Sequence, residues 1–391
     1  MDRLNAFFAL CRAGLWADVV EGTQLDPAPF AAATEEEWVA LYRMALSQAM
    51  VAICFDGLRQ LPVTCRPPRP LYLQWAAKTA QVEQTNKALN VMARRVIALC
   101  QAEGIHPVVL KGQGVAACYA HPLHRQCGDI DLFVGRADAK RTVRLLEAAG
   151  AEQDGEANYK HVGLDWEGIH LEIHRLVGRL NNPWTNRQLQ HWVGEWYPEA
   201  IGHRQGFPVP DATFEAYFIF HHAFGHFLNS GIGLRQLCDW ARLLYTQHQQ
   251  RAGAECAGVP HDGVYPDGGG LEACFSHLGL LRAAQIFGDV LVRQLGLPFA
   301  CLPWASADEQ GLGDLLLREI LATGNFGQWD SRIPPRPKGY WSGKWHTFTR
   351  VLRRCRMLYR FAPAEAFWYP LRLVQGTLAI QYDRLIHRQQ F

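Results

Sequence analysis

The stretch Gly128-Asp129-Ile130-Asp131-Leu132-Phe133-Val134 decides the fold, because it has the pattern of a short β-strand that begins with two carboxylates. Side chains alternate between the two faces of a strand, so Asp129 and Asp131 point to one face and the apolar residues to the other. Two carboxylates this close repel each other unless a cation lies between them, and Mg²⁺ binds such a pair together with phosphate oxygens and water. A bare Asp-x-Asp pair is more often a solvated strand edge, so the flanking sequence has to decide.

The upstream sequence makes the pattern more specific. The apolar run 107–110 predicts a second strand, and Lys111-Gly112-Gln113-Gly114 leads from it into a short helix over 113–119. A glycine at such a turn lets the backbone approach a phosphate closely, and the helix N-terminus offers free N–H groups to the anion. This segment is therefore a candidate phosphate-binding turn.

The downstream sequence supplies a candidate third acid. His170-Leu171-Glu172-Ile173-His174 predicts another alternating strand, with Glu172 and both histidines on one face. Strand pairing would bring Glu172 beside the Asp pair. The histidines are candidates for orienting Glu172 or for proton transfer, and His174 is equally well explained as an ordinary hydrogen-bonding partner.

Several segments resemble a known family. The similarity is carried by Val109-Leu110-Lys111-Gly112, Tyr119, Pro122, Arg125 and the strand from Gly128 to Leu132, and continues in His221-His222, 233–240 and 363–365. These residues resemble the bacterial family described only as uncharacterised nucleotidyltransferases, which is placed in the DNA polymerase beta-like nucleotidyltransferase superfamily. The superfamily implies three carboxylates that bind two Mg²⁺ ions and a Gly-rich turn that holds a nucleoside triphosphate.

The resemblance assigns roles by position. Asp129 and Asp131 correspond to the metal pair and Glu172 to the third acid, and these three are the expected catalytic residues. The nucleotide-binding set is Lys111, Gly112, Gln113, Arg125 and Gly128. Lys111 and Arg125 are the best candidates for phosphate contacts, because arginine can donate two parallel hydrogen bonds and lysine acts as a point charge. The alternative for both is charge balance beside the acidic strand.

A second group of candidates lies in the helical pattern that follows. On the helix predicted around 218–227, His222 and His226 are one turn apart, which suits two zinc ligands, although the Glu of a zinc-protease helix is absent. The favoured interpretation is a helix that lines the cleft beside the α/β unit, together with His174. Arg235 and Asp239, also four residues apart, can pair with each other or face the same cleft; as a surface ion pair they would contribute at most about 1 kcal/mol.

Composition agrees with an enzyme of two or three packed units. The chain has 391 residues, 49% of them hydrophobic, and a net charge of only +2, which gives no broad electrostatic footprint for nucleic acid. Eleven scattered cysteines without a Cys-x-x-Cys pair favour reduced thiols and a cytoplasmic location. No secretory signal and no transmembrane segment are expected.

The predicted fold is α+β, with a small mixed-sheet nucleotidyltransferase core at 104–180 between helical regions at 1–103 and 181–391. Apolar periodicity predicts helices over 4–13, 35–58, 71–102 and 137–149, strands near 159–165 and 169–174, and a surface loop over 251–270. The basic and aromatic segment 338–360 is a weaker candidate for contact with a membrane surface or an acidic polymer.

The function expected from these patterns is Mg²⁺-dependent transfer of a nucleoside monophosphate from a nucleoside triphosphate to a hydroxyl or phosphate acceptor, with Mn²⁺ as a substitute metal. The acceptor is unknown, with a weak preference for a sugar. One alternative is a catalytically inactive nucleotide-binding or scaffold protein, because Gln113 stands where the superfamily usually has Ser or Gly. Another is a metal hydrolase that uses His222 and His226.

Overall fold

The computed structural model describes residues 1–19, 25–157, 160–198, 201–229, 231–256, 270–304, 311–330, 332 and 339–387. The N-terminal region is helical, as the sequence predicts: α1 (Arg3–Leu15), α2 (Glu35–Ser47), α3 (Val51–Gln60) and the long α4 (Arg69–Ala102). The predicted helix 35–58 is wrong as one element. Ala49 between α2 and α3 has a φ of 55°, a left-handed conformation that an α-helix cannot contain.

A five-stranded mixed sheet forms the centre of the α/β unit. Its order is β1-β2-β5-β4-β3, and its strands are β1 (Val108–Val109), β2 (Ile130–Phe133), β3 (Glu152–Ala157), β4 (His161–Trp166) and β5 (Ile169–His174). β2 runs parallel to β5 and antiparallel to β1, whereas β4 pairs antiparallel with both β5 and β3. The α+β class is therefore confirmed, although β3 was not among the predicted strands.

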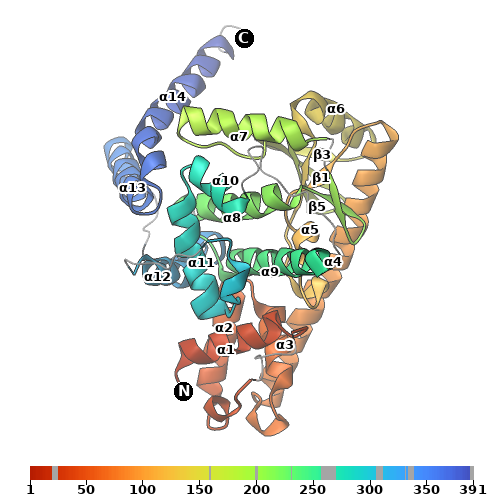
Figure 1. Cartoon of the computed structure of the whole chain (residues 1–391), viewed down its shortest axis with the longest axis vertical. Helices are drawn as coiled ribbons and strands as arrows, with labels where there is room; N and C mark the ends of the chain where they lie inside the picture. The colour runs from red at the N-terminus through yellow and green to blue at the C-terminus, as the bar shows by residue number, and fades with distance from the viewer. Residues whose placement is uncertain are drawn as a thin grey trace.

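The two faces of the sheet differ in chemistry. One face packs its apolar side chains, among them Ile130, Leu132 and Ile173, against α4 and α6 (Gly135–Ala148). The other face carries the acidic side chains and is directed toward the C-terminal helices. Figure 1 shows α4 along one side of the sheet, with α7 (Pro183–Trp196), α8 (Ala212–Asn229) and α9 (Leu234–Cys256) on the other.

The remaining elements complete the helical C-terminal part. They are the hairpin β6 (Gly202–Arg204) and β7 (Phe207–Val209), α10 (Leu271–His277), α11 (Leu281–Leu295), α12 (Leu312–Thr323), α13 (Tyr340–Phe361) and α14 (Pro363–His387). A large apolar core joins side chains of α1–α3, β1 and these helices. None of the helices, over the residues that are described, is both long enough and apolar enough to cross a lipid bilayer.

Two further predictions need correction. The short helix predicted over 113–119 is α5 (Gln113–Ala116), which ends three residues earlier. The predicted surface loop 251–270 is wrong in its first part, because α9 continues to Cys256, and its remainder at 257–269 lies outside the described residues.

Candidate active site

Three carboxylates meet on the polar face of the sheet. In the parallel pair of β2 and β5, Asp131 lies directly beside Glu172, and Asp129 immediately precedes β2. One carboxylate oxygen from each of the three residues lies within 4.8 Å of the others, so together they could hold a metal ion. Strand alternation and pairing therefore bring together the three acids that the sequence singled out; their catalytic roles stay predictions.

Lys111 lies between the two aspartates. It follows β1, whose continuation Leu110 donates a backbone hydrogen bond to the carbonyl of Asp131 at 3.1 Å. The Nζ atom is 3.1 Å from Asp129 Oδ2 and 2.8 Å from Asp131 Oδ2. Burial favours the neutral amine, yet the carboxylates raise the pKa of Lys111, so it carries a full charge. In this state Lys111 balances the acidic charge, and its contact with phosphate stays a prediction.

His174 lies between the other carboxylate pair. Its Nε2 atom is 3.1 Å from Asp131 Oδ1 and 3.0 Å from Glu172 Oε2. Burial works against its charged form, but these two hydrogen bonds raise the pKa of His174 above its ordinary value. Burial also disfavours the charged form of Glu172, yet His174 and Lys111 together hold the Glu172 pKa at about 2. Lys111 and His174 therefore each lie between two of the three carboxylates and hold them in place.

Sequence reasoning missed His161, which belongs to the same cluster. Its Nδ1 atom is 3.3 Å from Glu172 Oε2, and its ring meets that of His174 edge-on with centroids 4.9 Å apart. His161, Glu172 and His174 form a second group that could hold a metal ion. The tight turn at Glu167-Gly168 pairs Trp166 with Ile169 and hence His161 with His174. Counting back from this turn along the two strands predicted near 159–165 and 169–174 would have found His161.

The other strand histidine does not join the group. His170 contacts Asp165 at 3.0 Å and Asp154 at 3.5 Å through Nδ1, and no hydrogen bond to Glu172 is formed among the described residues. The hydrogen bonds to Asp165 and the nearby carboxylates outweigh burial and raise the pKa of His170. Of the strand histidines, His174 and His161 therefore contact Glu172, and His170 does not.

The glycine turn has the backbone geometry that only glycine adopts readily. Gly112 has φ 61° and ψ −113°, and a Cβ atom there would lie 3.7 Å from the carbonyl oxygen of Asp129. The turn thus packs against the start of the acidic strand. The next side chain, Gln113, is buried, and neither atom of its amide has a hydrogen-bond partner among the described residues. At Gly128 a Cβ would meet nothing within 4 Å.

Arg125 forms a buried ion pair with Asp239. Its Nε and Nη2 atoms donate to the two Asp239 oxygens at 2.9 and 2.6 Å, and the Tyr119 hydroxyl donates to the same carboxylate at 2.7 Å. Both residues are only 3% exposed. Asp239 therefore pairs with Arg125 rather than with Arg235, and this is no surface pair. Most of the Arg125 guanidinium is committed to this contact; phosphate binding by Arg125 stays a prediction.

Several long-range contacts hold the loop that leads to Asp129. Asn86 on α4 donates to the carbonyls of Leu123 and Arg125 at 2.6 and 2.8 Å. From α9, Arg235 donates to the carbonyl of Gln126 at 2.6 Å. Arg235 is itself buried, and no carboxylate forms an ion pair with it within the described residues. The loop is thus fixed by two helices that lie far apart in the sequence. The Arg235 guanidinium beside the loop has no carboxylate partner among the described residues.

The histidines of α8 face the acidic cluster. His222 Nε2 and His226 Nε2 are 3.2 Å apart. Burial lowers the pKa of both rings, and the positive charges of Lys111 and Lys160 lower it further, to about 4 for His226. At neutral pH both rings are therefore uncharged. In the described part of the chain, neither belongs to a group of three candidate metal ligands.

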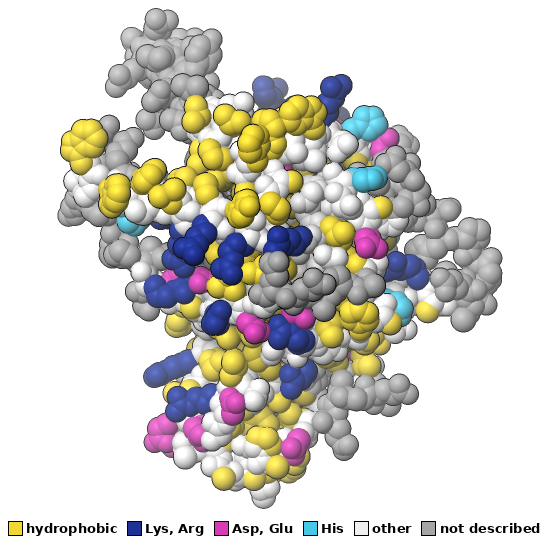
Figure 2. Space-filling view, turned by 60° about the vertical axis from the view of Figure 1, so that its left-hand side comes forward, with side chains coloured by type: hydrophobic (Ala, Val, Ile, Leu, Met, Phe, Trp, Pro, Cys, Tyr) yellow, Lys and Arg dark blue, Asp and Glu magenta, His cyan; other side chains and the backbone are white. Residues whose placement is uncertain are grey.

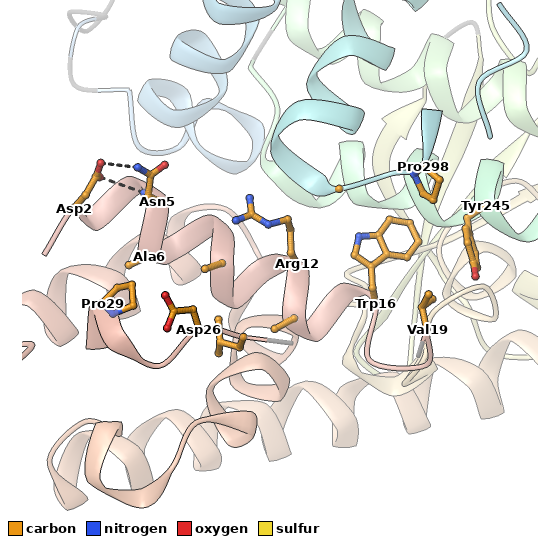
Figure 3. A pocket seen from close by; sticks show the side chains of 14 residues that line it. Asp2, Asn5, Ala6, Arg12, Trp16, Val19, Asp26, Pro29, Tyr245 and Pro298 are labelled. Atoms are coloured by element: carbon orange, nitrogen blue, oxygen red, sulfur yellow. Dashed lines mark hydrogen bonds between the residues drawn. The ribbon is translucent and has the colours of Figure 1, made fainter. Parts of the chain in front are cut away.

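A separate cavity of about 710 Å³ lies away from these residues. Figure 3 shows that Arg12 and Trp16 from α1, Tyr245 from α9 and Pro298 line it. None of the residues predicted for the site does, and no candidate metal-binding group of the described residues lies there. This cavity therefore lies apart from the candidate catalytic residues.

A comparison with models of known protein families gives a match. The sequence model of the family described as uncharacterised nucleotidyltransferase matches residues 34–255, more than half of the chain, and this range includes the three carboxylates, Lys111 and α8. A search of curated proteins and a search of solved structures each found no match. The family match covers more than half of the chain and includes the acidic cluster. The chain therefore belongs to this nucleotidyltransferase family.

Proposed function

We propose that the protein is a Mg²⁺-dependent nucleotidyltransferase of the DNA polymerase beta-like superfamily, of bacterial origin, that transfers a nucleoside monophosphate from a nucleoside triphosphate to a hydroxyl or phosphate acceptor. The observation that carries the proposal is the convergence of Asp129, Asp131 and Glu172, whose carboxylate oxygens lie within 4.8 Å of one another. All three lie within the segment 104–180, which supports that segment as the catalytic core between the helical regions 1–103 and 181–391.

The donor set fits a hard divalent cation. All three groups offer carboxylate oxygens, which Mg²⁺ and Mn²⁺ prefer. Two nitrogen groups, Lys111 Nζ and His174 Nε2, lie between pairs of these carboxylates at 2.8–3.1 Å, where a bound cation would also be favoured. When bound, the metal would neutralise charge on the triphosphate and on the departing pyrophosphate.

Lys111 and Arg235 would then bind the triphosphate of the nucleotide. A metal ion between the aspartates would compete with Lys111, whose flexible side chain can turn to the triphosphate instead. Arg235 is buried near Asp129 with no ion-pair partner among the described residues, and its guanidinium suits a phosphate oxygen. These two residues are therefore better candidates for phosphate binding than Arg125, whose charge is already paired.

The proposed transfer is a substitution at the α-phosphorus. An acceptor oxygen forms a bond to this phosphorus while the bond to the bridging oxygen of the β-phosphate breaks, and pyrophosphate leaves with the electron pair. Glu172, with a pKa of about 2, is a weak base and is better suited to metal binding than to taking the acceptor proton, which would pass to solvent. The contribution of the chain is positioning and charge stabilisation.

The test is transfer from α-labelled nucleoside triphosphates in the presence of Mg²⁺, with a panel of sugars, lipid-linked sugars, amines, peptides and RNA ends as acceptors. The Asp129→Asn/Asp131→Asn protein should lose transfer by about 10²–10³-fold, the usual effect of removing groups that stabilise transition-state charge. Asp138→Asn/Asp314→Asn, with the same change of charge on α6 and α12, is the matched control. Equal transfer by the two double variants would refute the assigned roles.

One observation favours a second candidate, a nucleotide-binding or scaffold protein without turnover. Lys111 fills the space between the two aspartates, and a lysine that never leaves would keep metal out. Calorimetry separates the candidates: nucleotide binding that is independent of Mg²⁺, with no pyrophosphate release for any acceptor, is expected only from the inactive protein.

A further inference from the structure

The helix α13 exposes a continuous apolar stripe. Its members are Trp341, Trp345, Phe348, Leu352 and Tyr359, and each is at least half exposed, with Trp341 at 81%. Their spacings of 4, 3, 4 and 7 residues place all five on one side of an α-helix. Single exposed apolar residues are ordinary on protein surfaces. A stripe that contains two tryptophans and extends over several helical turns indicates a contact surface.

The next helix exposes apolar side chains with the same kind of spacing. Phe367, Leu371 and Val374 of α14 are exposed by 72%, 50% and 57% and are again spaced by 4 and 3 residues. α13 and α14 follow each other directly and pack together as a helical hairpin, which we call the α13–α14 hairpin. Figure 2 looks on to the side where these helices lie and shows a band of hydrophobic side chains bordered by a row of Lys and Arg side chains.

The hairpin is fixed to the body of the protein. Glu365 at the start of α14 is buried and accepts backbone hydrogen bonds from Asn181 and Asn182. From α13, Arg354 donates to the carbonyl of Leu228 at 2.9 Å and to the Tyr369 hydroxyl. The apolar stripe is therefore presented outward by a held element, and no described part of the chain covers it.

The border of the stripe is strongly basic. The 22 residues of α13 contain no Asp or Glu. Arg353 pairs with Glu319 of α12 at 3.1 Å, whereas Arg356 and Arg360 are exposed and form no ion pair with any carboxylate that the structure describes. Arg356 and Arg360 lie one turn apart beside the stripe. Apolar side chains flanked by unpaired guanidinium groups are complementary to a surface that is apolar inside and anionic outside.

We propose that the α13–α14 hairpin docks on the surface of an anionic lipid bilayer, lying in the plane of the interface without crossing it. The aromatic rings would enter the boundary between headgroups and acyl chains, and the arginines would contact lipid phosphates. A second copy of the chain fits less well, because it would bring two rows of like charge together. A nucleic acid would stack on the aromatic rings but would gain little from Leu352, Leu371 and Val374.

The test is flotation of the full-length protein with vesicles of phosphatidylcholine alone or mixed with phosphatidylglycerol. We expect binding to the mixed vesicles that is at least 10-fold tighter than to phosphatidylcholine and that weakens as salt is raised, because each arginine near an anionic surface changes the affinity about 5-fold. Equal, salt-independent binding to both vesicles, or no binding to either, would overturn the proposal.

Paired variants test which residues are used. Arg356→Glu/Arg360→Glu should weaken binding to the mixed vesicles at least 10-fold, whereas Lys140→Glu/Arg144→Glu, an equal charge change on exposed positions of α6, should leave it unchanged. Equal effects of the two pairs would mean that net charge alone matters and would contradict docking through the hairpin.

The apolar stripe has its own matched pair of variants. Trp341→Ser/Trp345→Ser/Phe348→Ser should reduce vesicle binding at least 10-fold. The control substitutes serine at three exposed apolar residues of the N-terminal region, which are Val63, Leu73 and Val91. Both proteins should keep the wild-type circular dichroism spectrum. If the first triple variant instead loses self-association in light scattering, or binding to a labelled RNA, while vesicle binding persists, the surface serves that other partner.

Discussion

Substitution of Asp239 by Asn should destabilise the protein by about 3–5 kcal/mol, the usual cost of removing one partner from a buried ion pair. The carboxylate accepts two hydrogen bonds from Arg125 at 2.6 and 2.9 Å and one from Tyr119 at 2.7 Å, in surroundings where the charged groups are 3% exposed. Asparagine keeps the shape but leaves the Arg125 guanidinium buried without a counter-charge. Arg235, whose positive charge also faces Asp239, makes this imbalance worse.

The assay is urea unfolding at neutral pH followed by circular dichroism. Tyr119→Phe, which removes only one of the three hydrogen bonds, should cost about 1.5 kcal/mol and serves as the graded control. Arg125→Met/Asp239→Leu should recover most of the loss, since an apolar pair of similar volume often replaces a buried ion pair without cost. If Asp239→Asn unfolds within about 1 kcal/mol of the wild type, the argument from burial is wrong.

The same double variant tests the role of Arg125. If Arg125 acts by holding the loop before Asp129, Arg125→Met/Asp239→Leu should regain nucleotidyl transfer together with stability. If Arg125 binds phosphate, as the sequence predicts, stability should return while transfer stays low.

Two further predictions concern Lys111 and His124. Lys111→Met should raise Mn²⁺ affinity about 10-fold or more in calorimetry, because the ammonium no longer competes for the aspartates, while transfer falls; unchanged Mn²⁺ affinity would show that Lys111 does not occupy the metal position. His124 contacts Asp56 at 2.6 Å and Glu83 at 2.9 Å, and these hydrogen bonds outweigh burial and raise the pKa of the ring. The stabilisation by protonated His124 is therefore complete below the unfolded pKa of about 6.5 and is lost as pH rises through the folded pKa. The difference in unfolding free energy between wild type and His124→Gln should shrink from pH 6 to pH 9. A difference that grows would contradict a raised pKa of His124.

The acidic strand could be predicted from sequence because its information is local. Alternation sorts Asp129 and Asp131 from the apolar residues of β2, and the same rule gives the face of Glu172 on β5. Pairing of the two strands was an expectation, which the parallel register of Asp131 with Glu172 confirms. The division of the chain at 103 and 180 stays a prediction, and the apolar core that joins side chains from all three segments does not decide it.

The contacts that hold the site could not be predicted in the same way. Arg125 and Asp239 are 114 residues apart, and no periodic pattern tells which carboxylate on a distant helix meets which guanidinium. Spacing along α9 suggested Arg235 as the partner of Asp239, but the packing of α9 against the loop decides otherwise. Likewise, the sequence predicts that Lys111 binds phosphate, whereas in the folded chain its ammonium group contacts Asp129 and Asp131.

The most direct measurement is the anomalous diffraction of a crystal soaked with Mn²⁺ and a non-hydrolysable nucleoside triphosphate. We predict manganese bound by Asp129, Asp131 and Glu172, with the Lys111 ammonium turned away from the aspartates toward the phosphates. A crystal in which Lys111 still lies between the aspartates, with no manganese at the three carboxylates, would contradict this prediction.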